Sequence, residues 1–139
     1  MNDDDRRLEG WWQVESLAWD GQPIRPVDDA WYHFGSGKVL FIDRTMPTRE
    51  QCFYRLEPER SPGHLILGDG SNRTPQVYAY RFPDDDTLLL CESGIPGGAV
   101  PDVVETVPGD GRRLIRLIRD PDAVADRPGN AGISGKGLK

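Results

Sequence analysis

The chain has 139 residues, a length typical of one domain that can bury its own hydrophobic core. Its 17 Lys and Arg against 23 Asp and Glu give a net charge of −6, which disfavours nucleic acids and anionic membrane surfaces as partners. Sixteen glycines and 12 prolines leave little room for long helices.

The first residues, "MNDDDRR", are acidic and lack the apolar stretch of a signal peptide. No run approaches the roughly 18 apolar residues of a transmembrane helix. We therefore expect a cytoplasmic location, in which Cys52 and Cys91 stay as free thiols.

Eight short apolar segments bounded by turn residues predict strands. They span residues 9–18, 30–35, 38–43, 51–57, 63–68, 76–82, 87–92 and 112–119. The absence of helical periodicity between them indicates an all-β barrel or sandwich, with one candidate helical turn in "RPVDDAW". Around this domain (8–120) we expect a disordered N-terminus (1–7) and a flexible or surface-draped tail (121–139).

The first strand carries three of the four tryptophans, and its alternation assigns them to two faces. With Trp12 inward, the inner face holds Gly10, Trp12, Val14, Ser16 and Ala18. The outer face then holds Trp11, Gln13, Glu15, Leu17 and Trp19. This assignment predicts Trp12 as a core residue and leaves Trp11 and Trp19 for an interface or a covered surface.

Motifs along the chain resemble the lipocalin and calycin superfamily, and most closely a family of short, uncharacterised bacterial lipocalin-like proteins. The matching residues are Leu8, Gly10, Trp12, Ser16, Asp20, Gly21, Phe34, Gly37, Lys38, Tyr54, Leu56, Pro58, Tyr80, Asp86, Leu88, Leu90, Cys91, Leu117 and Arg119. The resemblance covers roughly residues 8–120. It implies an antiparallel up-and-down β-barrel of about eight strands, in which Arg119 stacks on Trp12 beside Gly10 and closes one end.

Alternation along the other strands directs polar and aromatic side chains into this barrel. The candidate ligand-binding residues are Tyr32, Phe41, Tyr54, Tyr78, Tyr80 and Glu92. Several inward tyrosines and a carboxylate favour a cavity with an apolar wall and a few orienting polar groups. The alternative is a filled barrel whose tyrosine hydroxyls reach the mouth.

Known reactive motifs are missing from the sequence. His33 and His64 lie on separate predicted strands without ligands at metal-site spacing, so we expect no metal and no cofactor. There is no G-x-S-x-G nucleophile elbow, and strand cysteines are usually small buried hydrophobes. "GSG" at residues 35–37 and "PDDDT" at residues 83–87 are predicted hairpin turns. Catalytic residues are unknown at this point.

Three functions remain open. The first is binding of a small, moderately apolar molecule in the barrel. The second is a cofactor-independent cyclase or isomerase in the same cavity, such as a cycloaddition enzyme of natural-product biosynthesis in a GC-rich bacterium. The third is a protein-interaction barrel with a filled core, including a homodimer through Trp11 or Trp19.

The long segment 93–111 is predicted to close the mouth as a lid, with Gly97 and Gly98 as a hinge and Met46 opposite.

Overall fold

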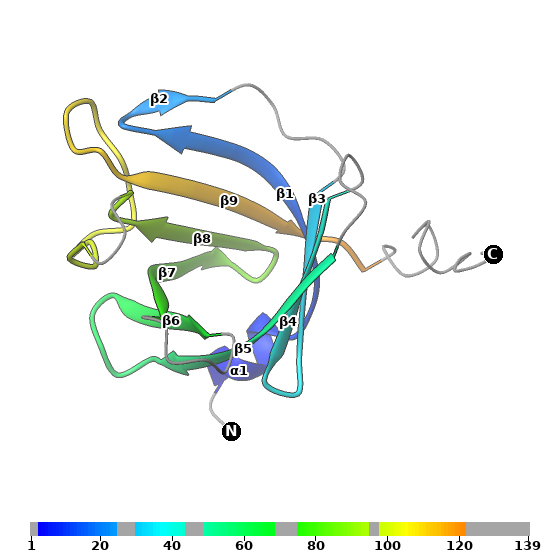
Figure 1. The fold of residues 1–139 in the computed structure, drawn as a ribbon. Helices are drawn as coiled ribbons and strands as arrows, with labels where there is room; N and C mark the ends of the chain where they lie inside the picture. The colour runs from blue at the N-terminus through cyan, green and yellow to red at the C-terminus, as the bar shows by residue number, and fades with distance from the viewer. Residues whose placement is uncertain (1–2, 25–29, 44–48, 69–74, 95–97, 122–139) are drawn as a thin grey trace.

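The computed structural model describes residues 3–24, 30–43, 49–68, 75–94 and 98–121 (Figure 1). Within them the elements are α1 (Asp3–Leu8), β1 (Gly10–Trp19), β2 (Gln22–Pro23), β3 (Ala30–Gly35), β4 (Lys38–Asp43), β5 (Arg49–Glu57), β6 (Gly63–Gly68), β7 (Gln76–Asp84), β8 (Thr87–Glu92) and β9 (Arg113–Arg119). The eight predicted strands are confirmed to within two residues at each end. The short β2 was not predicted.

The strands form a closed antiparallel barrel. Each strand from β3 to β9 pairs with the next along the chain, and β1 pairs with both β3 and β9. The two-residue β2 pairs with β1 alone. Because β1 joins the first and last members of the sheet, eight strands close into one ring. The expected all-β, antiparallel up-and-down barrel of eight strands is therefore confirmed.

The two ends of this barrel differ. The tight β3–β4, β5–β6 and β7–β8 turns lie at one end together with α1, and we call this the closed end (Figure 1). The β3–β4 turn is the predicted hairpin, in which Ser36 and Gly37 both have positive φ, as a type I′ turn requires. At the opposite end, which we call the mouth, β1, β4, β6 and β8 end, and Met46 and Gly97 lie outside the described residues.

Residues 3–8 form a helix where the sequence predicted a disordered N-terminus. Three aspartates occupy the first turn and two arginines the last, which suits the helix dipole, and Leu8 is buried in the core. A six-residue helix shows too little periodicity to be recognised from sequence. Among the described residues no helix is long and apolar enough to cross a membrane.

A β-bulge changes the face assignment in the second half of β1. Opposite β9, Val14 pairs with Leu117 but Ser16 pairs with Arg116, so Glu15 is the extra residue. The predicted faces are correct up to Glu15 and wrong from Ser16 onward. Leu17 packs against the inner core, and Ser16 and Ala18 take the outer face.

The two flanking tryptophans of β1 consequently lie on different faces. Trp11 is on the outer face, where its ring centroid lies 4.7 Å from that of His33. Trp19 follows Leu17 onto the inner face at the mouth and remains 57% exposed. The two indoles therefore do not form the shared outer surface that strict alternation predicted.

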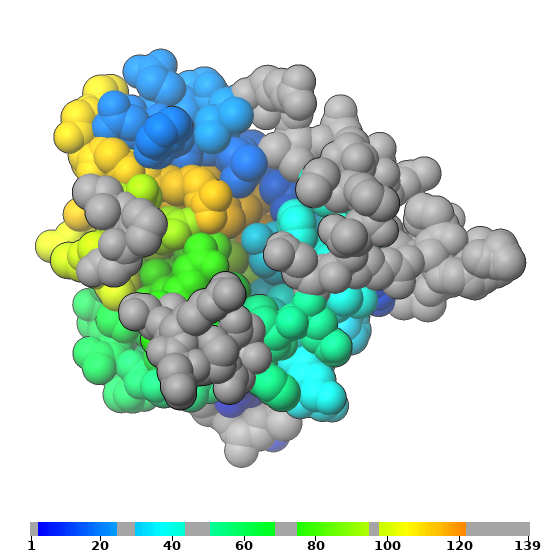
Figure 2. Space-filling model, viewed as in Figure 1, coloured from blue at the N-terminus to red at the C-terminus, as the bar shows by residue number. Residues whose placement is uncertain are grey.

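Residues 98–112, which we call the strap, run along the outside of the barrel. Val104 packs against Ala79, Leu89 and Cys91 on the outer face of β7 and β8. Thr106 Oγ1 accepts a hydrogen bond of 2.9 Å from the Gly21 amide. Figure 2 shows the strap in yellow beside the blue β1–β2 region.

This position corrects the prediction of a lid over the mouth. The apolar centre of the segment covers an apolar strip of the outer wall instead. Asp20 Oδ1 accepts hydrogen bonds from the amides of Gly109 and Gly111, at 3.0 and 2.6 Å, and ties the end of the strap to the β1–β2 turn. The proposed partner Met46 and hinge residue Gly97 lie outside the described residues, whereas Gly98 is described and irregular.

We predict that the strap shields Cys91 from alkylation. The thiol is fully buried, and burial raises its pKa to about 11. At pH 8 only about one thiol in a thousand would then be the reactive thiolate, so native Cys91 should react with iodoacetamide far more slowly than in unfolded protein. The rate should rise as the pH approaches 11, because a raised pKa delays deprotonation.

Two neighbouring valines provide the matched pair for this test. Val104→Asp places a charge at a 7% exposed position and should speed Cys91 alkylation, measured by peptide mass mapping at pH 8. Val103→Asp changes a 43% exposed side chain and should leave the rate unchanged. Equal rates in both variants and wild type would show that the strap does not protect the thiol.

Candidate ligand-binding site

The closed end is filled by a stack between the first and last strands. Trp12 is 0% exposed, and the Arg119 guanidinium carbon lies 4.2 Å from the centroid of its ring. This is a cation–π geometry. Gly10 has φ of +117°, and a Cβ there would lie 3.2 Å from Arg119 Nη1, so glycine suits both the backbone and the close approach.

The same two side chains also hold α1 against the barrel. Trp12 Nε1 donates a 2.7 Å hydrogen bond to the carbonyl of Leu8. Arg119 donates through Nη1 to the Glu9 carbonyl at 2.9 Å and through Nη2 to the Arg7 carbonyl. These donors satisfy carbonyls at the helix C-terminus that have no partner within the helix.

The barrel interior holds both fully buried and partly exposed side chains. Toward the closed end Phe34, Leu88 and Leu117 are fully buried, and the inward Leu56 and Phe82 are partly buried. Toward the mouth, inward side chains such as Leu17 and Leu67 pack on the core but stay partly exposed. Solvent therefore reaches the inner wall in the upper half, which we define as the half nearer the mouth.

A polar cluster lies on this inner wall, on the adjacent strands β7, β8 and β9. We call its four residues the mouth cluster: Gln76, Tyr78, Glu92 and Arg113. Gln76 Nε2 donates to the Tyr78 hydroxyl at 2.7 Å and to Glu92 Oε1 at 3.2 Å. Arg113 forms an ion pair with Glu92 and donates through Nη2 to the Tyr78 hydroxyl at 3.4 Å.

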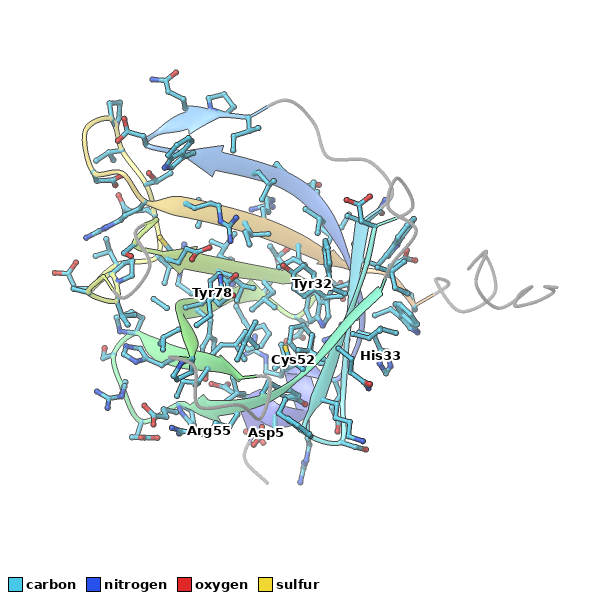
Figure 3. All side chains as sticks on the ribbon, in the orientation of Figure 1. Asp5, Tyr32, His33, Cys52, Arg55 and Tyr78 are labelled. Atoms are coloured by element: carbon cyan, nitrogen blue, oxygen red, sulfur yellow. The ribbon has the colours of Figure 1, made fainter. Side chains whose placement is uncertain are left out.

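Tyr78 lies at the centre of the cluster and is only 2% exposed. Burial raises the pKa of its hydroxyl above the usual value, Tyr32 and Glu92 raise it further, and Arg113 opposes them. The hydroxyl therefore stays protonated at neutral pH. Figure 3 shows Tyr78 and Tyr32 directed into the enclosed space from facing parts of the wall.

The structure separates the six predicted ligand-binding residues into two groups. Tyr32 and Phe41 are neighbours with ring centroids 5.0 Å apart, and they share the upper half with Tyr78 and Glu92. Tyr54 and Tyr80 lie toward α1. There the Tyr80 hydroxyl donates a 2.6 Å hydrogen bond to Asp4, and burial followed by this bond raises its pKa.

Sequence reasoning missed Gln76 and Arg113, although a signal for each was present. In β9, Ile115, Leu117 and Arg119 share one face, and the same alternation continued by one step reaches Arg113. Gln76 precedes Tyr78 and Tyr80 in the same way on β7. Both residues lay at the predicted strand ends, where alternation was not extended.

Other features offer less for binding. An open groove of about 600 Å³ lies outside the barrel between α1, the β5–β6 turn and the strap. Its lining carries charges of both signs, from Asp4, Arg7, Arg60 and Asp102, and so favours no one charge on a ligand. Among the described residues no three His, Cys, Asp or Glu side chains are grouped as a metal ion would need. Cys52 faces the interior and Cys91 the outer wall, and both are free thiols.

The geometry thus defines a closed eight-stranded antiparallel barrel with a polar cluster near its mouth. The chain is similar to a lipocalin-like protein from Bacteroides uniformis ATCC 8492, with 16% identity, a TM-score of 0.49, and coverage of 82% of this chain and 99% of the other. An uncharacterized protein from Bacteroides eggerthii DSM 20697 has 11% identity and a TM-score of 0.49, with coverage of 81% and 99%. No family model matches the sequence, and no curated protein matches it.

Proposed function

We propose that the protein binds one small, moderately apolar molecule in the upper half of the barrel. The observation that carries this proposal is the mouth cluster, in which the buried Tyr78 lies together with Glu92, Arg113 and the exposed Gln76 on an inner wall that is otherwise aromatic and aliphatic. A few fixed polar groups in an apolar cavity are typical of small-molecule sites, because they orient a ligand whose body is held by apolar contact.

The composition of the wall supports a ligand with both characters. Tyr32, Phe41 and Leu67 provide apolar surface that stays partly exposed in the absence of a ligand. Covering such surface stabilises a complex by about 25 cal/mol for each Å² removed from water. The mouth cluster would hold the polar end of the same molecule.

Filling the upper half should abolish binding. We expect Leu67→Trp to prevent the saturable fluorescence increase of phenylnaphthylamine that wild-type protein should give, because the larger side chain occupies the ligand's space. Fluorescence titration measures the binding, and the melting temperature verifies the fold. Saturable binding that survives in Leu67→Trp, or no saturable binding in wild type, would contradict the proposal.

The adjacent residue offers the matched control. Ile66→Trp adds the same side chain on the outer face of β6 and should leave the titration unchanged, because Ile66 alternates with the inward Leu65 and Leu67. Loss of binding in both variants would indicate general damage to the barrel.

A cyclase or isomerase that uses the same cavity is the second candidate. The observation in its favour is a protonated Tyr78 hydroxyl beside the Arg113 guanidinium, an arrangement that stabilises negative charge developing on a substrate oxygen. A gene that lies beside polyketide or peptide synthase genes would favour this candidate over simple binding. The protein-interaction barrel is not pursued, because Trp11 and Trp19 lie on different faces, and a homodimer through either one stays a prediction.

A further inference from the structure

Two donors of the mouth cluster lack an acceptor among the described residues, whereas the acceptor Glu92 Oε2 is held in the ion pair with Arg113. The Tyr78 hydroxyl accepts hydrogen bonds from Gln76 and Arg113, and among the described residues no group accepts its own hydrogen. Arg113 Nε is also buried without a partner in the described part of the chain. A buried donor without an acceptor is costly, so both point to a missing acceptor at this place.

The charges of the cluster restrict the kind of acceptor. Arg113 is the cation of the cluster, and Glu92 already balances it through their ion pair. An incoming carboxylate would meet the Glu92 carboxylate, whose side chain is only 17% exposed, and would be repelled. A neutral oxygen has no such penalty, and the two donors that need an acceptor belong to Tyr78 and Arg113, side chains that already contact each other.

We propose that the ligand presents a neutral carbonyl oxygen, as in a ketone, ester or amide, to the Tyr78 hydroxyl and Arg113 Nε. The apolar part of the molecule then lies along Tyr32, Phe41 and Leu67. This inference rests on the proposed function, since it names the chemical class of ligand for the same cavity.

Three naphthalene probes, each substituted at the same ring position, test whether the ligand carries a neutral carbonyl group. They are acetylnaphthalene with a neutral carbonyl, naphthoate with a carboxylate, and ethylnaphthalene with neither. Wild-type protein should bind acetylnaphthalene about tenfold more tightly than the other two, which is the value of one or two well-placed hydrogen bonds. Tightest binding of naphthoate or of ethylnaphthalene would overturn the carbonyl assignment.

The variant Tyr78→Phe should weaken acetylnaphthalene about tenfold and leave ethylnaphthalene unchanged, because only the hydroxyl is removed. Thr87→Val removes another buried hydroxyl, at the closed end of β8, and should alter neither affinity. The infrared carbonyl stretch of bound acetylnaphthalene should lie at lower frequency in wild type than in Tyr78→Phe. An identical stretch in both would overturn the proposed hydrogen bond.

The outcomes separate this inference from the proposed function. If none of the three probes binds and phenylnaphthylamine does not bind either, the proposal of a ligand-binding cavity in the barrel is wrong. If the probes bind equally and Tyr78→Phe has no effect on any of them, binding in the barrel stands and the carbonyl inference alone is wrong.

Discussion

Replacing Trp12 by alanine is expected to lower the free energy of unfolding by about 3–5 kcal/mol. The indole is 0% exposed, lies 6.2 Å from the Phe82 ring and 4.2 Å from the Arg119 guanidinium carbon, and donates to Leu8. Its removal leaves a cavity at the closed end and frees the last turn of α1. Urea denaturation at neutral pH measures the difference.

Trp19→Ala is the matched control for this prediction. It removes the same side chain from the same strand, but Trp19 is 57% exposed and its one hydrogen bond, to the Gly111 carbonyl, is exposed as well. We expect a loss of about 1 kcal/mol or less. Comparable losses in the two variants would mean that the indole of Trp12 does not close the barrel.

Arg119→Ala is expected to destabilise the protein by about 2–4 kcal/mol, because it removes a charged donor from three carbonyls together with the stack on Trp12. The amide of Glu9, which donates to the Asp5 carbonyl within α1, should also lose hydrogen-exchange protection. Denaturation and exchange measured by mass spectrometry report the two effects separately.

The neighbouring arginine on the outer face tests whether this effect depends on position. Arg116 forms a 2.5 Å ion pair with Glu15, and both side chains are 45% exposed. Arg116→Ala should therefore cost only about 0–1 kcal/mol, and less at high salt. If Arg119→Ala proved as mild as Arg116→Ala, Arg119 would be a surface residue in effect, and α1 would be held by other contacts.

The strands were predictable because their signals are local. Apolar alternation and turn residues such as Gly35–Gly37 lie within a few positions of one another, and the resemblance supplied the closure between Trp12 and Arg119. The bulge was missed because it needs one extra residue, Glu15. Its trace in the sequence is Leu17, a large aliphatic residue that strict alternation placed on the outer face.

The helix and the strap depend on contacts that no local pattern contains. The carbonyls of α1 are satisfied by side chains on β1 and β9, the latter 110 or more residues away. The apolar centre of the strap correctly predicted that this segment covers an apolar surface. It did not show which surface, because the outer positions of β7 and β8 are apolar and compete with the mouth for the strap. At the candidate site, the alternation of side chains predicted Tyr78 and Glu92 correctly. It was not extended by one more step along β9, which would have reached Arg113.

The double pairing of β1 also determines when this protein can reach its native state during synthesis. The first strand leaves the ribosome early, but its long edge from Trp12 to Trp19 pairs with β9, the last strand of the barrel in chain order. Until then the nascent chain carries an unpaired strand edge with large apolar residues, the kind of edge that promotes aggregation. Barrel closure is therefore expected to wait for β9 and to be slow, because it must bring together segments about a hundred residues apart.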